Sequence, residues 1–304
     1  MTHVATLIAS RGAPLPDGIE RLAAAILPGA GVAVWLDPGI ALDIPFTLKK
    51  AASSAGTGVT TAGLRAALLA AVGTAADVAV QEAASRRKRL LLADMDSTMI
   101  GQECIDELAG FIDARDRVAA VTERAMRGEI EFAAALRERV AVLEGLPAST
   151  IEEVIAQRIT LSPGGPELVR TMRRHGAYTC LVSGGFTAFT SRIAAAIGFD
   201  EHRGNRLLVR DDGCLAGRVA EPILGREAKL ETLRELRARF RLARSETLVV
   251  GDGANDLAMI EDAGLGAAFH AKPVVAARAA FTVEYGDLTA LLFAQGYRRD
   301  EFVE

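Results

Sequence analysis

Two aspartates, Asp94 and Asp96, lie two residues apart in the sequence Asp-Met-Asp-Ser-Thr, directly after the apolar run Leu90–Ala93. Carboxylates that follow a buried strand of an α/β sheet can both face one ligand. Such a pair can bind a hard cation, or one member can attack a phosphoryl group while the other moves a proton. Two aspartates at this spacing are also common in turns and helix caps. The rest of the chain therefore decides whether this pair is functional.

Three further polar sites follow in an order that suits phosphoryl transfer. Ser183, Gly184 and Gly185 come after a second apolar run. Asp252 comes after a third, and Lys229 lies on a predicted helix between them. The serine hydroxyl and the amides after it can donate to phosphate oxygens, since glycines let the backbone approach closely.

A magnesium ion is expected beside these groups. Mg²⁺ prefers hard oxygen ligands and keeps several waters. The carboxylates of Asp94 and Asp252 and the main-chain carbonyl of Asp96 would therefore be enough protein ligands. An aspartate nucleophile repels a dianionic phosphate, and Mg²⁺ together with Lys229 would reduce that repulsion.

The elements that position these residues are predicted to form a doubly wound parallel α/β sheet. Helical patterns separate the apolar runs Leu90–Ala93, Tyr178–Val182, Thr247–Val250 and Leu265–Phe269. The clearest of these patterns are Glu167–Arg174, Phe189–Ile197 and Arg226–Phe240. Strands that alternate with helices indicate this architecture, and they place the polar sites at one edge of the sheet.

Two insertions into the sheet are predicted. The segment from Gln102 to Arg158 reads almost wholly as helix and is longer than one crossover requires. We therefore predict an inserted helical cap at about residues 100–162. The segment Asn205–Arg218, with Asp-Asp-Gly at its centre, predicts a β-hairpin.

Residues 1–84 are predicted to form a small separate domain, followed by a larger domain at 85–304. Ser53–Gly58 reads as a loop of small residues. The predicted strands and helices follow the order βαββαβ of the ferredoxin-like unit, in the segments Val4–Ala9, Asp17–Leu27, Gly31–Leu36, Leu42–Thr47, Thr61–Val72 and Asp77–Gln81. In this pattern the segment resembles small amino-acid-sensing modules of the ACT kind.

The net charge, the cysteine spacing and the apolar stretches indicate which partners and which location to expect. The net charge of −4 gives no basic field, so nucleic acid is not expected as a partner. The cationic run Ser85–Arg89 contains no aromatic residues and reads as a solvated linker. The cysteines fit neither a disulfide framework nor a zinc pattern, and no apolar stretch has the character of a membrane span. We therefore expect a soluble cytoplasmic protein.

The motifs in this order resemble those of the haloacid dehalogenase superfamily of phosphatases. That superfamily has a DxDx[TV] motif, a strand-end Ser or Thr, a lysine and an acidic GDxxxD-type cluster, and the match spans residues 90–270. The resemblance implies that Asp94 is the nucleophile that forms a phospho-aspartate. Asp96 would be the general acid for the leaving group and then the base that activates water. Dehalogenases do not need this second acid, so the phosphatase branch fits better.

The same resemblance assigns the remaining site residues. Ser183 and Lys229 would hold the phosphate, with Asn255 as a further phosphate contact. Asp252 would complete the metal site, and Asp256 would support the ligands of the metal.

Longer runs resemble the phosphoserine phosphatase family over residues 90–285. They include Glu103–Glu107, Thr122–Gly128 and Leu136–Val140. The resemblance implies hydrolysis of O-phospho-L-serine to L-serine and phosphate, the last step of serine biosynthesis. Glu103 would pair with the substrate ammonium and Arg139 would bind its carboxylate. Met126 and Phe132 would close an apolar wall over the site.

Other functions stay open from the sequence. A phosphotransferase would pass the phosphoryl group to an alcohol such as homoserine. A phosphatase for another metabolite, such as a sugar phosphate, is disfavoured by Glu103 and Arg139. A regulatory protein would sense an amino acid such as serine through residues 1–84. The oligomeric state does not follow from the sequence.

Overall fold

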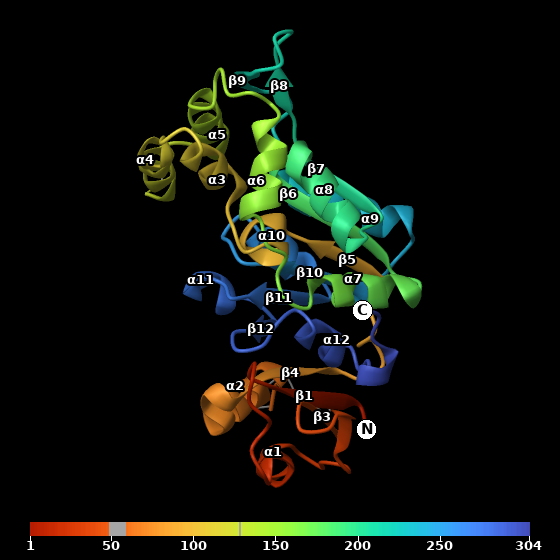
Figure 1. Ribbon diagram of the computed structural model, residues 1–304. Helices are drawn as coiled ribbons and strands as arrows, with labels where there is room; N and C mark the ends of the chain where they lie inside the picture. Colours follow the sequence, from red (N-terminus) through yellow and green to blue (C-terminus); the bar gives the residue numbers. More distant parts are fainter. Residues whose placement is uncertain (49–58, 128) are drawn as a thin grey trace.

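The computed structural model describes residues 1–48, 59–127 and 129–304. Its parts follow one another along one long axis, with the N-terminal sheet at one end and a group of helices with a hairpin at the other (Figure 1). The parallel sheet lies between them. The loop expected at Ser53–Gly58 and the side chain of Met126 lie outside the described residues.

The central sheet has six strands, all parallel to their neighbours, in the order β12-β11-β10-β5-β6-β7. The strands are β5 (Leu90–Ala93), β6 (Tyr178–Phe186), β7 (Glu201–Asn205), β10 (Thr247–Gly251), β11 (Leu265–Phe269) and β12 (Phe281–Val283). Sequence analysis did not predict the edge strands β7 and β12. Strand β7 is polar and β12 has only three residues, so neither shows the apolar run of a central strand.

Helices cover both faces of this sheet. Leu90 and Leu92 share a core with α9 (Arg226–Arg239), α10 (Leu257–Asp262) and α11 (Pro273–Ala276). The alternate residues, Leu91 and Ala93, face α7 (Gly165–Arg174), α8 (Thr187–Ile197) and α12 (Ala290–Ala294). Successive strand residues point to opposite faces. The apolar run is therefore buried on both sides, and the predicted doubly wound core is confirmed.

The described residues form four inserted helices between β5 and α7, the helix that leads into β6. They are α3 (Cys104–Gly110), α4 (Arg115–Met126), α5 (Phe132–Ala141) and α6 (Thr150–Arg158). We call these helices the cap. A bridge between Ile100 and Leu161 joins the two ends of the insertion.

A hairpin of β8 (Leu207–Val209) and β9 (Leu215–Val219) is bonded to the cap. The main-chain N–H of Leu215 donates to Leu146 O at 2.8 Å, and that of Gly145 donates to Leu215 O at 3.0 Å. The cap and the hairpin lie together at the end of the molecule far from the N-terminus (Figure 1).

The N-terminal segment forms a four-stranded antiparallel sheet in the order β2-β3-β1-β4. Its elements are β1 (His3–Ala9), α1 (Ile19–Ile26), β2 (Val34–Asp37), β3 (Ala41–Phe46), α2 (Thr61–Val72) and β4 (Ala76–Glu82). The order βαββαβ is as predicted. Helices α1 and α2 cover one face, and the other face packs toward the central sheet through Ile8 and Ala79. The domain boundary at residue 84 stays a prediction.

The linker between the two sheets is less solvated than the sequence suggested. Arg86 Nη1 lies 2.6 Å from Asp43 Oδ2, and this guanidinium also donates to the carbonyl of Ala294. Lys88 is only 5% exposed and donates to the carbonyl of Ser85 within the linker and to that of Ser245 before β10, and burial lowers its pKa to about 8. The prediction of a solvated linker is therefore wrong for these two cations. Arg86 joins the N-terminal sheet to α12, and Lys88 ties the linker to the turn before β10.

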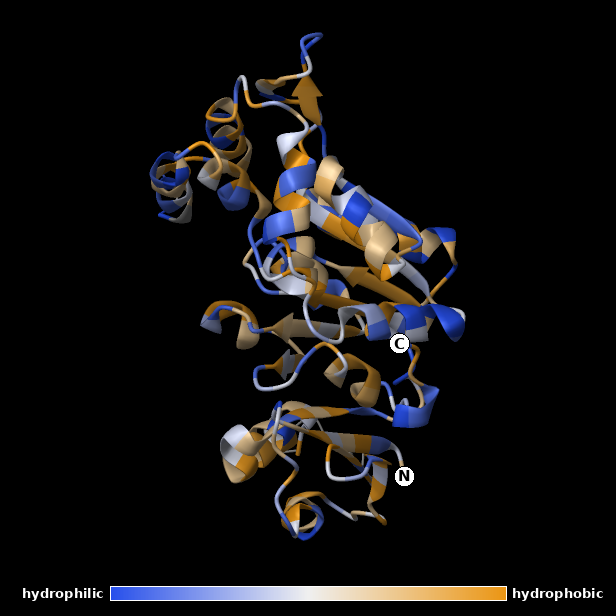
Figure 2. Cartoon of the chain, viewed as in Figure 1, coloured by the Kyte–Doolittle hydropathy of each residue, from blue (hydrophilic) through white to orange (hydrophobic). Residues whose placement is uncertain are grey.

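Short 3-10 turns complete the chain at Gly73–Ala75, Arg244–Glu246 and Arg299–Glu301. Apolar residues concentrate in the strands of the central sheet, whereas the outer helix α4 is largely polar (Figure 2). No helix among the described residues combines the length and the apolar composition that a membrane crossing requires.

Candidate active site

Asp94 lies directly beyond the carboxyl end of β5. Its main-chain N–H donates to Val250 O at 3.0 Å, which extends the pairing with β10 by one residue. Its Oδ1 accepts from the N–H of Met95 at 2.7 Å. The chain then turns through Met95–Met99, where Ser97 has a φ of 54° in the left-handed region. The turn brings Asp96 back over the end of the sheet.

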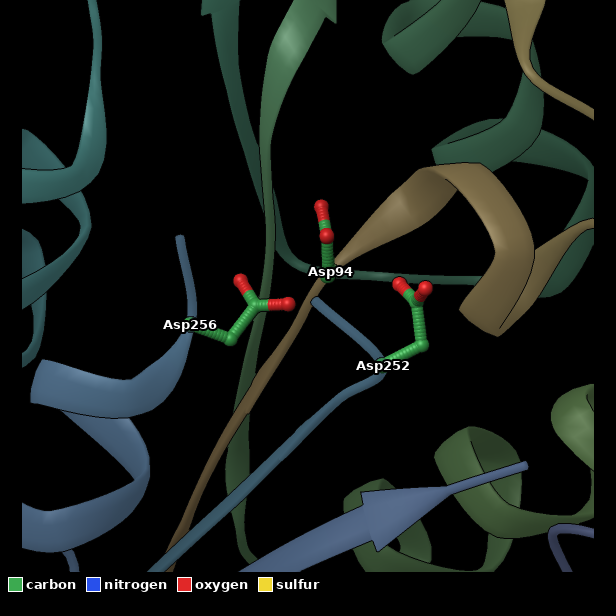
Figure 3. Close-up of side chains that lie close together, drawn as sticks. All are labelled: Asp94, Asp252 and Asp256. Atoms are coloured by element: carbon green, nitrogen blue, oxygen red, sulfur yellow. The ribbon is translucent and has the colours of Figure 1, made fainter. Parts of the chain in front are cut away.

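Three carboxylates converge at this edge of the sheet. Oxygens of Asp94, Asp252 and Asp256 all lie within 4.8 Å of one another (Figure 3). Asp94 follows β5, and the other two follow the adjacent parallel strand β10. Thr98 Oγ1 lies 3.4 Å from Asp252 Oδ1 and fixes that side chain from the β5 side. The group is therefore held by two neighbouring strand ends.

Lys229 supplies the buried cation of the site. Its side chain is 1% exposed, and Nζ lies 2.7 Å from Asp94 Oδ1 and 2.7 Å from Asp256 Oδ1. Burial lowers the pKa of Lys229, but Asp256 and Asp94 outweigh that effect, so the pKa is raised overall. Asp256 Oδ2 also accepts from the N–H of Gly253 at 3.1 Å. The lysine is therefore permanently charged and joins the nucleophile candidate to the loop after β10.

The carboxylates outnumber this one ammonium. Burial, then the charge of Asp256, raise the pKa of Asp94 well above its ordinary value. The same two causes raise the pKa of Asp252 to about 6, and burial raises the pKa of Asp96. Clustered buried carboxylates disfavour one another's charged forms unless a cation joins them. The oxygen donors and their excess negative charge fit a hard divalent cation.

Asp96 lies apart from this cluster and faces β6. Its Oδ1 accepts from the N–H of Cys104 at 3.0 Å, and its Oδ2 accepts from Ser183 Oγ at 3.2 Å. Ser183 Oγ in turn accepts from the N–H of Gly185 at 2.8 Å. The carboxylate therefore stands between the start of the cap and the strand-end serine. The expected metal site used only the main-chain oxygen of Asp96, and not this carboxylate.

The two residues expected to select the substrate lie on the cap side. Ser97 Oγ donates to Glu103 Oε1 at 2.8 Å. Glu103 is exposed to solvent. Partial burial of its carboxyl group, and next the charge of Asp96, raise the pKa of Glu103 to about 7. Arg139 is half buried on α5, and burial lowers its pKa. Its guanidinium makes only long bonds, to Ala135 O at 3.4 Å and Thr122 Oγ1 at 3.5 Å.

Phe132 connects the cap to the phosphate-side loops. A Cβ built on Gly184 would lie 3.2 Å from Phe132 Cζ, and one on Gly225 would lie 3.2 Å from Phe132 Cδ1. The ring therefore lies against both glycines. Asn255 is half buried in the loop after β10, beside the acidic cluster.

Apart from Met126, whose side chain is not described, the predicted site residues thus lie along one edge of the sheet or on the cap beside it. Two hydrogen bonds of the site were not predicted from the sequence. Thr98 Oγ1 donates to Asp252, and the N–H of Cys104 donates to Asp96. The threonine of the Asp-Met-Asp-Ser-Thr motif was a usable signal, because it follows the same strand end. The amide carried no signal in the sequence.

Comparisons with known proteins agree with this geometry. Residues 91–261 match the family model of haloacid dehalogenase-like hydrolases. The chain is 43% identical over 203 residues to a phosphoserine phosphatase of Idiomarina loihiensis, covering 67% of this chain and 91% of that one. It is 42% identical over 227 residues to phosphoserine phosphatase SerB2 of Mycobacterium tuberculosis, covering 74% of this chain but only 55% of the relative. The chain thus spans about half the length of that relative.

A solved structure extends the likeness over the whole chain. It is a haloacid dehalogenase family hydrolase from Salmonella enterica serovar Typhi, with a TM-score of 0.81 and 28% identity. The match covers 99% of each chain. The likeness therefore includes the N-terminal sheet as well as the central sheet and the cap.

Proposed function

Because this chain belongs to the haloacid dehalogenase-like hydrolase family, we propose that it is a magnesium-dependent phosphatase that hydrolyses O-phospho-L-serine to L-serine and phosphate. The observation that carries the proposal is the convergence of Asp94, Asp252 and Asp256 around buried Lys229, with Glu103 and Arg139 on the cap beside them. The relatives named phosphoserine phosphatase support the choice of substrate.

The reaction would proceed in two displacements at phosphorus. An oxygen of Asp94 forms a bond to phosphorus while the bond from phosphorus to the serine oxygen breaks. Asp96 gives its proton to that leaving oxygen, which departs as the serine hydroxyl. Asp96 then takes a proton from water, and the resulting hydroxide attacks the phospho-aspartate and releases phosphate and the free Asp94 carboxylate. The raised pKa of Asp96 favours its first role as an acid.

The phosphate would be held from two sides. Lys229 offsets its charge next to the nucleophile, and Ser183 with the amides of Gly184 and Gly185 offers neutral donors. Asn255 would add a donor from the loop after β10. These groups are fixed by strand ends and a buried ion pair, so little reorganisation is needed when the transferred group becomes more charged.

Mg²⁺ would be held by the carboxylates of Asp94 and Asp252 and by the main-chain oxygen of Asp96. When bound, it would offset the charge that accumulates on the phosphoryl oxygens. Asp256 would act through Lys229, since one of its oxygens already bonds that ammonium and the other bonds Gly253.

The cap would select phosphoserine by its amino-acid portion. Glu103 pairs with the ammonium and Arg139 with the carboxylate. In the structure Arg139 bonds only neutral oxygens among the described residues, so its guanidinium can take a carboxylate without breaking an ion pair. Regulation by serine through residues 1–84 and a cytoplasmic location stay predictions.

The direct test is phosphate release from L-phosphoserine, compared with a panel of sugar and aryl phosphates. We expect turnover with Mg²⁺, loss of turnover with excess EDTA, and a strong preference for phosphoserine. Metal-dependent release from the other esters alone would retain the aspartyl-phosphate mechanism and refute the substrate. Release that persists in EDTA after extensive dialysis would refute the metal requirement.

A further inference from the structure

Asn205 is a buried polar residue that the catalytic scheme above does not use. It ends β7 and is 2% exposed. Its side-chain amide is fully engaged with main-chain atoms. Nδ2 donates to Gly184 O at 2.8 Å and to Leu224 O at 3.0 Å, and Oδ1 accepts from the N–H of Leu224 at 2.7 Å. Since a buried amide left unpaired is costly, these three bonds hold their partners firmly in place.

The two partner segments both carry phosphate-binding groups. Gly184 lies between Ser183 and Gly185 in the last residues of β6, and we call these three residues the phosphate loop. Leu224 precedes Gly225, the N-cap of α9, and Lys229 lies in the first turns of that helix with its N–H bonded to Gly225 O. A single side chain therefore ties the neutral donors of the site to the helix that carries its cation.

The surrounding backbone supports this connection. The pairing of β6 with β7 shifts register between Val182 and Phe186, so the phosphate loop bulges out of the ladder and cannot be held by regular strand bonds. Strand β7 still approaches it closely, because a Cβ on Gly204 would lie only 3.2 Å from Gly185 O. Phe132 of the cap packs on Gly184, whose carbonyl Asn205 binds, and on Gly225, which follows Leu224.

We infer that Asn205 is a positioning residue for phosphate binding: it fixes the phosphate loop at the end of β6 and the start of α9 at the spacing that one phosphate group requires. The inference rests on the proposed function only in taking these two segments as the phosphate site. It concerns the phosphate alone, so the effect of losing Asn205 is the same for every ester. It leaves the metal ligands untouched, because they follow β5 and β10.

The test compares Asn205→Asp with the unmodified full chain. The Asp side chain has the size of Asn and keeps its acceptor oxygen. The second oxygen, which replaces Nδ2, cannot donate to the carbonyls of Gly184 and Leu224. We expect the dissociation constant of orthophosphate, measured by calorimetry with Mg²⁺, to rise roughly 10- to 100-fold. The kcat/KM for phosphoserine and for p-nitrophenyl phosphate should fall by one common factor, while the Mg²⁺ activation constant stays within about twofold. Asn205→Ala should give the same pattern.

Leu215→Ala is the matched control. Leu215 is 1% exposed in the hairpin that follows β7, and it does not bond the phosphate loop. This variant should lower the melting temperature and leave orthophosphate affinity unchanged. An Asn205 variant that folds and binds orthophosphate within twofold of the unmodified protein would overturn the inference. So would a loss that differs between the two esters.

Hydrogen exchange on the unmodified protein tests the inference if neither Asn205 variant folds. Orthophosphate with Mg²⁺ should slow exchange at residues 184–185 and at 224–225 together, and protection confined to the first pair would overturn the inference. These measurements are separable from the choice of substrate. A protein that hydrolyses aryl phosphates but not phosphoserine would refute the proposed specificity, and the role of Asn205 would still be decided by orthophosphate binding.

Discussion

The edge of the parallel sheet and the cap differ in how completely their charges are paired. At the sheet edge, Lys229 is 1% exposed and contacts two carboxylates at 2.7 Å. On the cap, Arg139 is half buried and reaches only neutral oxygens at 3.4 and 3.5 Å. Glu103, between the two regions, opens to solvent, and among the described residues its carboxylate bonds only the Ser97 hydroxyl.

This difference in charge pairing follows the division between the groups proposed to transfer the phosphoryl group and those proposed to select the substrate. The groups proposed to transfer the phosphoryl group are already in contact, because neighbouring strand ends hold them. The groups proposed to recognise the serine moiety are placed but not yet paired, so the substrate itself would complete their interactions. Changes at the sheet edge should therefore affect every ester, and changes on the cap should affect phosphoserine above all.

The largest effect is expected from Asp94→Asn. The amide cannot attack phosphorus, so turnover of phosphoserine and of p-nitrophenyl phosphate should both fall at least roughly a thousandfold. Steady-state phosphate release measures the loss, and circular dichroism checks that the fold is retained. Clear residual release by a clean preparation of the variant would exclude Asp94 as the nucleophile.

Lys229→Met should damage both stability and catalysis. It leaves Asp94 and Asp256 buried without their cation, which typically costs about 3–5 kcal/mol. We expect a lower melting temperature without metal and a larger stabilisation by Mg²⁺ than in the unmodified protein, since the metal then offsets more unpaired charge. Thermal unfolding with and without Mg²⁺ measures both. Equal stabilisation of the two proteins would argue against a shared charge cluster.

Arg139→Ala tests the cap alone. Loss of a bidentate contact to the substrate carboxylate should lower kcat/KM for phosphoserine roughly 10- to 100-fold, mainly through KM. The value for p-nitrophenyl phosphate, which lacks that carboxylate, should change little. Arg137→Ala on the exposed side of the same helix is the matched control, since its partner is Glu221, which follows the hairpin. Equal losses on both esters would remove Arg139 from substrate recognition.

The smallest effect is expected from pH. The pKa of Glu103 is raised to about 7, so this carboxyl is neutral at pH 6 and ionised at pH 8. Only the ionised form pairs with the substrate ammonium. The KM for phosphoserine relative to that for p-nitrophenyl phosphate should therefore fall up to about tenfold from pH 6 to pH 8. The ratio cancels the ionisation of the phosphate itself, and Glu103→Gln should flatten it.

Much of the site could be predicted because its residues follow the central strands. Asp94, Ser183 and Asp252 each come directly after an apolar run, and the carboxyl ends of parallel strands meet at one edge. The edge strands β7 and β12 escaped prediction because they are short or polar. Asn205 escaped with them, since nothing local distinguishes it from any other asparagine before a hairpin.

In the linker Ser85–Arg89, by contrast, local composition led to a wrong prediction of solvent exposure. A run of cations normally predicts solvent exposure, and Arg87 and Arg89 do remain largely exposed. Arg86 and Lys88 instead reach Asp43 and Ser245, residues far away in the sequence. Local composition could not reveal these partners, because Asp43 lies on β3 and Ser245 in the turn before β10, and both reach the linker only in the folded chain.

The sequence by itself determined the chemistry: which oxygens and which ammonium are present, and that strand ends would gather them. Only the tertiary structure decided the pairing within that set. Lys229 lies between Asp94 and Asp256 because α9 packs on the face of the sheet formed by β5 and β10. Asn205 bridges the end of β6 and the start of α9 because β6 bulges away from β7. Spacing along the chain fixes which strand end a residue follows, whereas contacts between helices and loops depend on how the elements pack.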